Sequence, residues 1–302
     1  MKGNPTKANK KILDKDIFWG YLFIAPTLLG LLVLYIFPVL QTFFYSFTSW
    51  GDFGNYSWSG LENYKKMADD PEIWRAFKNT LVYAFAMVPI SIGISIFVAV
   101  LLNQKIKGLG IYRTLYFLPV VTMPAAIGMI WKWLYNSDYG VINQVLGWFS
   151  IDGPEWLTDP NWVLTSIIVV GVWSVIGTNM VILLSGLQGI PKSLYEAASL
   201  DGAGVNYMFF RITLPLLSPT IFFVAVISFI GAFQVFDFIF MMVSTTNPAI
   251  SSAQSVIYLF YRFAFEIGDK GMGAAIAFVL FIIILVLTIV QFRLQKKWVH
   301  YE

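Results

Sequence analysis

The sequence contains no cysteine and a single histidine, His300. Disulfide frameworks, thiolate chemistry and cysteine-based zinc sites are therefore excluded, and histidine-based acid–base catalysis has almost no material to work with. A phosphate-binding loop of the form G-x-x-x-x-G-K-[ST] is also missing, because no glycine is followed directly by lysine. These absences argue against a metal site and against an enzyme, and any ATP would have to be hydrolysed by a partner.

Charged residues are scarce as well. They make up 12% of the 302 residues, while 58% are hydrophobic and the mean hydropathy is +0.70. A soluble domain carries about 25% charged residues, so a chain this poor in charge cannot cover a water-facing globule and its excess apolar surface must face lipid. The net charge of +3 is small and predicts no nucleic-acid partner.

Six stretches are, or nearly are, long and apolar enough to cross a membrane as helices of about 20 residues. The first stretch is too long for a cleaved signal sequence and is interpreted as an uncleaved anchor. We expect the fifth to continue past Asp237 to Val243. The stretches are residues 17–51 (of which the first two thirds form the span), 80–102, 114–131, 161–190, 212–236 and 271–292. The sequence therefore predicts an all-α integral membrane protein, with tails at residues 1–16 and 297–302 and a six-helix domain at 17–296.

Lysine and arginine indicate the orientation of these helices, since they are enriched in short cytoplasmic loops. They are more numerous in both termini and in the loops on the same side than in the loops opposite. An even number of spans agrees, so the sequence predicts both termini in the cytoplasm. The outer loops then hold most of the tryptophans, which are interpreted as an interfacial belt or, alternatively, as a docking face for an extracytoplasmic partner.

The loop at residues 190–215 falls on the predicted cytoplasmic side and reads as a short helix. Pro191 suits a first helical turn, and Ser193 with Glu196 has the spacing of a capping box, so the helix could start at either point. Gly202 predicts its end, because a C-terminal cap often needs positive φ. Small side chains on such a helix allow another surface to approach closely, which suits docking to a soluble motor.

The same loop contains a spaced pattern: E-A-A, three residues, G, nine residues, I, one residue, L-P. It is formed here by Glu196, Ala197, Ala198, Gly202, Ile212, Leu214 and Pro215. This resembles the signature loop of the binding-protein-dependent ABC importer permeases. The resemblance implies that these seven residues and Asp201 couple the chain to an ATPase.

Other segments resemble the carbohydrate-uptake branch of that family, of the maltose type. They are residues 60–64 (G-L-E-N-Y), Asn79-Thr80, Phe236-Asp237, and the C-terminal segments 291–294 and 298–302. The ending is similar to that of the first of two paired permeases. One departure is the segment 244–248, which stands where relatives often have a glycine-rich turn.

The resemblance implies an assembly in a bacterial cell membrane. This chain would be a multi-pass subunit with the type I ABC importer permease fold, and a second permease would share the translocation pathway. Two ATP-binding subunits would hold ATP and magnesium, while this chain would bind no cofactor. A solute-binding protein would deliver a sugar from outside.

Polar residues deep in the spans are candidates for the substrate pathway, because such residues are costly in lipid and usually face an interior. Gln234 lies three residues before Asp237, on the same helical face. Asn179 lies at a similar depth in the fourth span, near Gly177 and Trp173. Amides and carboxylates bind sugar hydroxyls and aromatic faces cover sugar rings. Alternatively, these side chains bind a neighbouring helix or the partner permease.

Three other classes remain open at this stage. An ABC permease for amino acids, peptides or phosphate would share the E-A-A loop. A secondary transporter is disfavoured because no clear internal repeat and only one deep acid are found. A membrane enzyme is disfavoured by the missing catalytic residue types.

Overall fold

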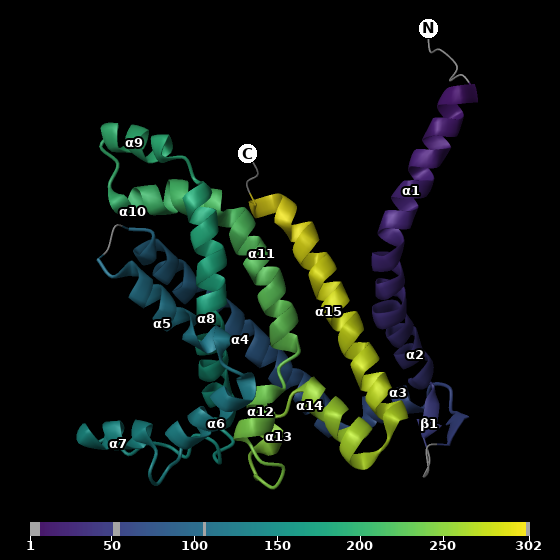
Figure 1. The fold of residues 1–302 in the computed structure, drawn as a ribbon. Coiled ribbons are helices and arrows are strands. Elements are labelled where there is room, and N and C mark those ends of the chain that lie inside the picture. The colour runs from purple at the N-terminus through teal and green to yellow at the C-terminus, as the bar shows by residue number, and fades with distance from the viewer. Residues whose placement is uncertain (1–6, 51–54, 105–106, 300–302) are drawn as a thin grey trace.

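The computed structural model describes residues 7–50, 55–104 and 107–299, which form a bundle of long helices with short elements at one end (Figure 1). The long helices are α4 (Pro71–Leu102), α8 (Val163–Gly189), α11 (Leu214–Phe233) and α15 (Lys270–Trp298), with α5 (Leu109–Val121) beside α8. Buried apolar side chains form two clusters between them, and the polar residues buried within the spans are mostly serine, threonine or asparagine.

The first span stands apart from this bundle (Figure 1). It consists of α1 (Lys7–Leu31), a π turn η1 (Leu32–Ile36) and α2 (Phe37–Tyr45). Over Ile17–Tyr45, none of its most apolar window is buried within the chain. Only the α2 end reaches the bundle, where the ring of Phe43 lies 4.7 Å from that of Phe278 in α15. The predicted first span is thus a helix whose apolar surface meets lipid or another subunit.

The third span differs from the straight helix expected over residues 114–131. Helix α5 ends at Val121, and α6 (Pro124–Leu134) leaves at an angle of 101°. Met123 directly precedes Pro124 and is extended, with ψ of 132°. A residue before proline is pushed out of the helical region, while proline itself is well suited to a first turn. The bend therefore has a local cause that hydropathy does not show.

The fifth span also differs from the expectation, because it does not run on to Val243. It comprises α10 (Val205–Met208), a π turn η3 (Phe209–Thr213) and α11, and it stops at Phe233. Gln234 to Phe236 are not helical, and a separate short helix α12 (Asp237–Met242) follows. The predicted single helical face for Gln234 and Asp237 is therefore wrong.

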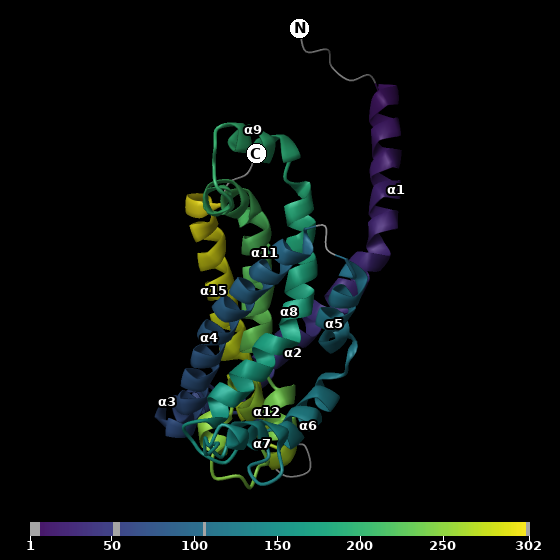
Figure 2. The same ribbon diagram turned by 90° about the vertical axis from the view of Figure 1, so that its left-hand side faces the viewer.

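The remaining elements connect these helices. Helix α9 (Lys192–Leu200) lies at the same end of the molecule as the start of α1 and the end of α15 (Figures 1 and 2). The opposite end holds α7 (Val141–Trp148), α3 (Glu62–Asp69), α12, α13 (Ile250–Ala253), α14 (Val256–Tyr261) and the π turn η4 (Arg262–Ile267). It also holds the two-stranded hairpin of β1 (Thr48–Trp50) and β2 (Tyr56–Trp58). This arrangement agrees with the predicted placement of both termini on the side of the E-A-A loop.

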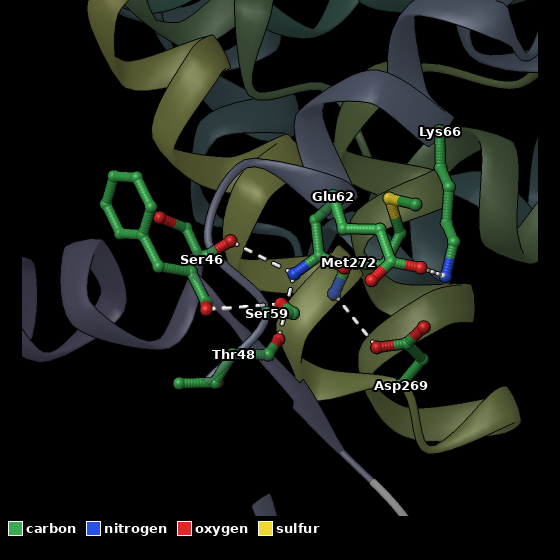
Figure 3. A network of polar contacts seen from close by, with 9 residues as sticks. Ser46, Thr48, Ser59, Glu62, Lys66, Asp269 and Met272 are labelled. Atoms are coloured by element: carbon green, nitrogen blue, oxygen red, sulfur yellow. Dashed lines mark hydrogen bonds and ion pairs between the residues drawn. The ribbon is translucent and has the colours of Figure 1, made fainter. Parts of the chain in front are cut away.

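The segment 60–64 that carried part of the resemblance fixes the hairpin to α3. Asn63 is buried, and its amide donates to the carbonyls of Ser46 (3.0 Å) and Thr48 (2.8 Å). The hydroxyl of Tyr64 donates to Ser46 Oγ at 2.6 Å. Figure 3 shows Ser46 and Thr48 beside the Glu62–Lys66 pair of α3, with Asp269 capping Met272 at the start of α15. The motif is thus structural at this end of the bundle.

Candidate functional site

A cavity of about 350 Å³ opens between the long helices at the point where α11 breaks. Helices α4, α6, α8 and α11 and the segment 234–238 contribute to its walls. The lining residues are Tyr83, Met87, Pro124, Ser174, Val175, Thr178, Asn179, Ile227, Ser228, Gly231, Ala232, Gln234, Val235, Phe236, Asp237 and Phe238. This mixture of apolar walls with a few convergent polar groups is typical of a small-molecule site.

The helix break places Gln234 and Asp237 in the cavity wall. Gln234 caps α11 with non-helical dihedrals of −101° and 16°, and its N–H donates to the carbonyl of Gly231 at 3.1 Å. The hydroxyl of Ser255, from the opposite loop, donates to the carbonyl of Val235 at 2.6 Å and holds the break in place. Irregular backbone within a membrane protein is tolerated where it lines a cavity. The position of the break at the cavity wall agrees with this rule.

Three of the five predicted pathway residues meet at this cavity: Asn179, Gln234 and Asp237. Asn179 is buried on α8, and its amide donates to Ser228 Oγ across to α11 at 3.5 Å. Gln234 and Asp237 are exposed, and within the described residues neither side chain makes a hydrogen bond or ion pair. Their polar groups are free to meet a ligand, whereas Asn179 also links two helices, as the alternative interpretation expected.

Trp173 and Gly177 lie elsewhere on α8. The ring of Trp173 stands 5.6 Å from that of Trp131 in α6, in an edge-to-face arrangement, and is 40% exposed. Gly177 faces α5, and a Cβ added there would come within 2.2 Å of the carbonyl oxygen of Tyr116. Gly177 therefore permits close approach of two helices, and neither residue lines the cavity.

The sequence analysis missed several polar groups of the cavity. Ser174 and Thr178 lie one turn apart on α8, and Tyr83 comes from α4. Ser174 and Thr178 are spaced i, i+4, which places them on one helical face. That spacing, immediately before Asn179, is the signal that would have identified the α8 wall.

At the other end of the bundle, α9 holds the E-A-A residues on an exposed helix. Glu196, Ala197 and Asp201 are exposed and Ala198 is half-buried. The helix ends in a Schellman motif. The N–H of Gly202 donates to the carbonyl of Ser199 at 3.1 Å, and the N–H of Ala203 donates to the carbonyl of Ala198 at 2.9 Å. Gly202 has φ of +77°, as predicted for a cap that favours glycine. The glycine therefore follows E-A-A by four residues because the helix that carries E-A-A ends there, at the position that needs positive φ.

Of the two starting points predicted for α9, one at Pro191 and one at Ser193, the structure has the first. The helix begins at Lys192 with Pro191 as its N-cap, and no side chain caps it. The predicted Ser193–Glu196 capping box is therefore not formed. Glu196 keeps its carboxylate exposed.

The second half of the signature lies at the base of α11. Ile212 is half-buried in the π turn η3, and Leu214 and Pro215 are half-buried in the first turn of α11. The large apolar side chains most exposed at this end of the bundle are Leu200, at the end of α9, and Val205, Tyr207 and Phe210, which follow it.

The far end of the bundle is tied together by an ion pair. Arg262 in η4 binds Glu72 of α4 through two nitrogens, with Nη1 to Oε1 at 2.7 Å. The hydrogen bond to Glu72 raises the pKa of Arg262 above its usual range. Asn79 adds bonds from α4 to the carbonyls of Ser251 (3.1 Å) and Gln254 (3.2 Å). The loop after α12 is thus fixed to α4 by side chains.

The fold combines a bundle of membrane-spanning helices, interrupted in the third and fifth spans, with an exposed short helix at one end. Residues 67–300 match the family described as "Binding-protein-dependent transport system inner membrane component". The match spans more than half of the chain, so the chain belongs to this family and is a multi-pass inner-membrane component of a transport system. The resemblance predicted from the E-A-A loop is confirmed.

Several relatives match the chain over nearly all of its length. The chain is 38% identical over 100% of its length, and 99% of the relative's, to "Probable ABC transporter permease protein YesP" of Bacillus subtilis (strain 168). It is 33% identical to "Multiple sugar-binding transport system permease protein MsmF" of Streptococcus mutans, over 96% of this chain and 98% of that one. It is 36% identical to "Arabinooligosaccharides transport system permease protein AraP" of Halalkalibacterium halodurans, over 91% and 86%.

Solved structures share the fold. A chain from "Crystal structure of a bacterial ABC transporter involved in the import of the acidic polysaccharide alginate" aligns with a TM-score of 0.82 at 23% identity, covering 94% of this chain and 98% of that one. A chain of the same kind of transporter, in complex with its alginate pentasaccharide-bound periplasmic protein, aligns with a TM-score of 0.81 at 22% identity, covering 95% and 96%. The predicted type I ABC importer permease fold is confirmed.

Proposed function

We propose that this chain is the transmembrane permease subunit of an ATP-driven importer for a sugar, either a monosaccharide or an oligosaccharide. The observation that carries the proposal is the exposed helix α9, which ends in a glycine cap and presents E-A-A at the end of the bundle where the chain's termini lie. In this proposal that end faces the cytoplasm, and residues Glu196 to Gly202 meet an ATP-binding subunit.

The proposal assigns the remaining parts of the machine to partners. Two ATP-binding subunits hold ATP and magnesium and carry out hydrolysis, so this chain binds no cofactor. A second permease completes the pathway, and this chain is the first of that pair. A solute-binding protein delivers the sugar to the far end of the bundle. The family description, which names a binding-protein-dependent system, supports this division of labour.

The charge of the cavity favours a neutral solute over an anionic one. Among the described residues that line the cavity, Asp237 is the only Asp, Glu, Lys, Arg or His. A phosphorylated solute would meet a carboxylate without a cation beside it, which costs free energy at the low dielectric of a membrane interior. A neutral sugar instead gains hydrogen bonds from the carboxylate and the amides. The names of MsmF and AraP support sugar, although a permease named for sn-glycerol-3-phosphate is 32% identical.

Reversal of one charge on α9 tests the coupling role. Glu196→Lys should lower copurification of the ATP-binding subunit about tenfold, because it puts a cation where the proposed docking surface has a carboxylate, and like charges brought together at an interface are costly. Asp138→Lys makes the same change at the far end and should leave copurification unaltered. Full-strength association of the Glu196→Lys variant would contradict the docking role of α9.

The substrate class is tested on the assembled complex. The complex is purified with its solute-binding protein, reconstituted in proteoliposomes and screened with labelled neutral sugars and sn-glycerol 3-phosphate. ATP-dependent uptake of a neutral sugar is expected. Uptake of the phosphate ester alone would refute the sugar assignment while leaving the importer assignment standing.

A further inference from the structure

Helix α9 touches the bundle through very few side chains. In the described part of the chain, Tyr195 and Ala198 are the only residues of α9 that are not exposed. Its last residue, Leu200, is 90% exposed. On one side α9 is joined to α8 through Ile190 and Pro191, and on the other Gly202 caps the helix before the chain continues to α10. In addition to these backbone connections, a movement of α9 can reach the bundle through a side-chain link.

Tyr195 supplies such a link. Its ring packs against the buried cluster formed by the ends of α4 and α8 and the start of α11. It also lines a cavity of about 200 Å³ together with Asn103, Leu187 and Thr213. Its hydroxyl lies 3.0 Å from Oγ1 of Thr213. This hydrogen bond joins α9 to the fifth span across 18 residues of sequence.

The Thr213 hydroxyl has a second partner. It lies 3.4 Å from the carbonyl of Met208, to which it can donate. Either hydroxyl of the Tyr195–Thr213 pair can act as the donor in the bond between them. The two bonds form a short relay from α9 into the π turn η3. Single-turn π segments occur frequently at functional sites.

Thr213 lies directly before the first residue of helix α11. It is 6% exposed, and α11 begins at the next residue and runs for 20 residues to the break at Gln234. At 1.5 Å per residue that is about 30 Å. The base of α11 meets α9 and its far end forms the cavity wall. A shift of Thr213 would therefore displace the helix that ends at Gln234.

We propose that the Tyr195–Thr213 hydrogen bond is the link through which α9 moves α11, so that both are positioning residues of the transport cycle. This rests on the proposed function, since it assumes that an ATP-binding subunit moves α9. The bond acts on α11 and so on the cavity, while the exposed surface of α9 that meets the partner does not include the Tyr195 hydroxyl.

The test compares conservative variants in the complete complex with its binding protein, reconstituted in proteoliposomes. Tyr195→Phe and Thr213→Val each delete one hydroxyl and keep the shape of the side chain. Solute uptake and ATP hydrolysis are measured together, and copurification of the ATP-binding subunit is measured separately. Two controls delete hydroxyls outside the relay: Tyr112→Phe, at an exposed position of α5, and Thr288→Val, whose hydroxyl binds the carbonyl of Ile284 in its own helix.

Each single variant should lower uptake per ATP hydrolysed about fivefold, as expected for one lost neutral hydrogen bond, with copurification and the controls at wild-type values. The double variant should lose no more than either single variant, because both delete the same bond. Wild-type uptake per ATP in both single variants would overturn the inference, and so would losses that multiply in the double variant. If the wild-type complex itself shows no ATP-driven uptake, the proposed function fails and not this inference alone.

Discussion

Gln234 sits at the residue where α11 stops, and its side chain is free to point into the cavity. Gln234→Ala should lower solute uptake about five- to tenfold, because one or two hydrogen bonds to the solute are lost. The measurement is initial uptake in proteoliposomes at a subsaturating solute concentration.

Assembly and basal ATP hydrolysis should survive in that variant, since no described contact depends on the Gln234 side chain. Gln41→Ala, which removes an exposed amide from α2 on the separate first span, serves as the matched control. Uptake at the wild-type rate in Gln234→Ala would remove this residue from the substrate pathway.

Gly177 represents the opposite case, a residue predicted for the pathway that the structure places in a helix contact. Gly177→Ala should lower stability by about 1–3 kcal/mol, because the added methyl meets the carbonyl of Tyr116 and forces α5 away from α8. The readout is the apparent Tm in detergent, with a drop of ~2–6 °C expected. Gly93→Ala, where a Cβ would meet nothing within 4 Å, should keep or raise the Tm. Equal Tm values for the two variants would contradict this packing role.

At the scale of the element, α9 depends on its glycine cap. Gly202→Val forces a branched residue into positive φ, which costs at least about 1–2 kcal/mol, so the helix end should fray and association with the ATP-binding subunit should weaken. Gly204→Ala, at φ of −74° with open space around it, should lose much less. The measurement is the copurification yield of the ATP-binding subunit with each variant. Equal yields would show that docking does not depend on the glycine cap.

Helix existence could be predicted from this sequence, but helix continuity could not. Hydropathy identified six apolar stretches, yet it treated residues 114–131 as one helix although Met123 and Pro124 bend the chain there. No proline directly precedes the break at Gln234. The break is held by the hydrogen bond from Ser255, in a distant loop, to the carbonyl of Val235, and such a contact cannot be predicted from local sequence. The α9 cap was predicted correctly because Gly202 is a local signal. The cavity was found only in part, since Tyr83 joins it through the packing of α4 on α8.

At the scale of the whole molecule, the Glu72–Arg262 pair joins the start of α4 to the loop before α15. Arg262→Met should lower stability by about 1–2 kcal/mol, because Glu72 then stays half-buried with fewer donors. The exposed Glu62–Lys66 pair of α3 offers a contrast, and Lys66→Met should leave the Tm almost unchanged. A Tm for Arg262→Met equal to that for Lys66→Met would show that the Glu72–Arg262 ion pair does not stabilise the fold.

The bend between α5 and α6 has a consequence for the surrounding lipid. A helix of 13 residues rises about 20 Å, which is short of the roughly 30 Å of hydrocarbon in a typical bilayer. Helix α6 leaves α5 at an angle of 101°, so it does not lengthen α5 along its own axis. Where such a short helix faces lipid, the acyl chains beside it have to adapt, which makes this flank sensitive to hydrophobic mismatch. We therefore expect uptake by the reconstituted complex to depend on the acyl-chain length of the surrounding lipid.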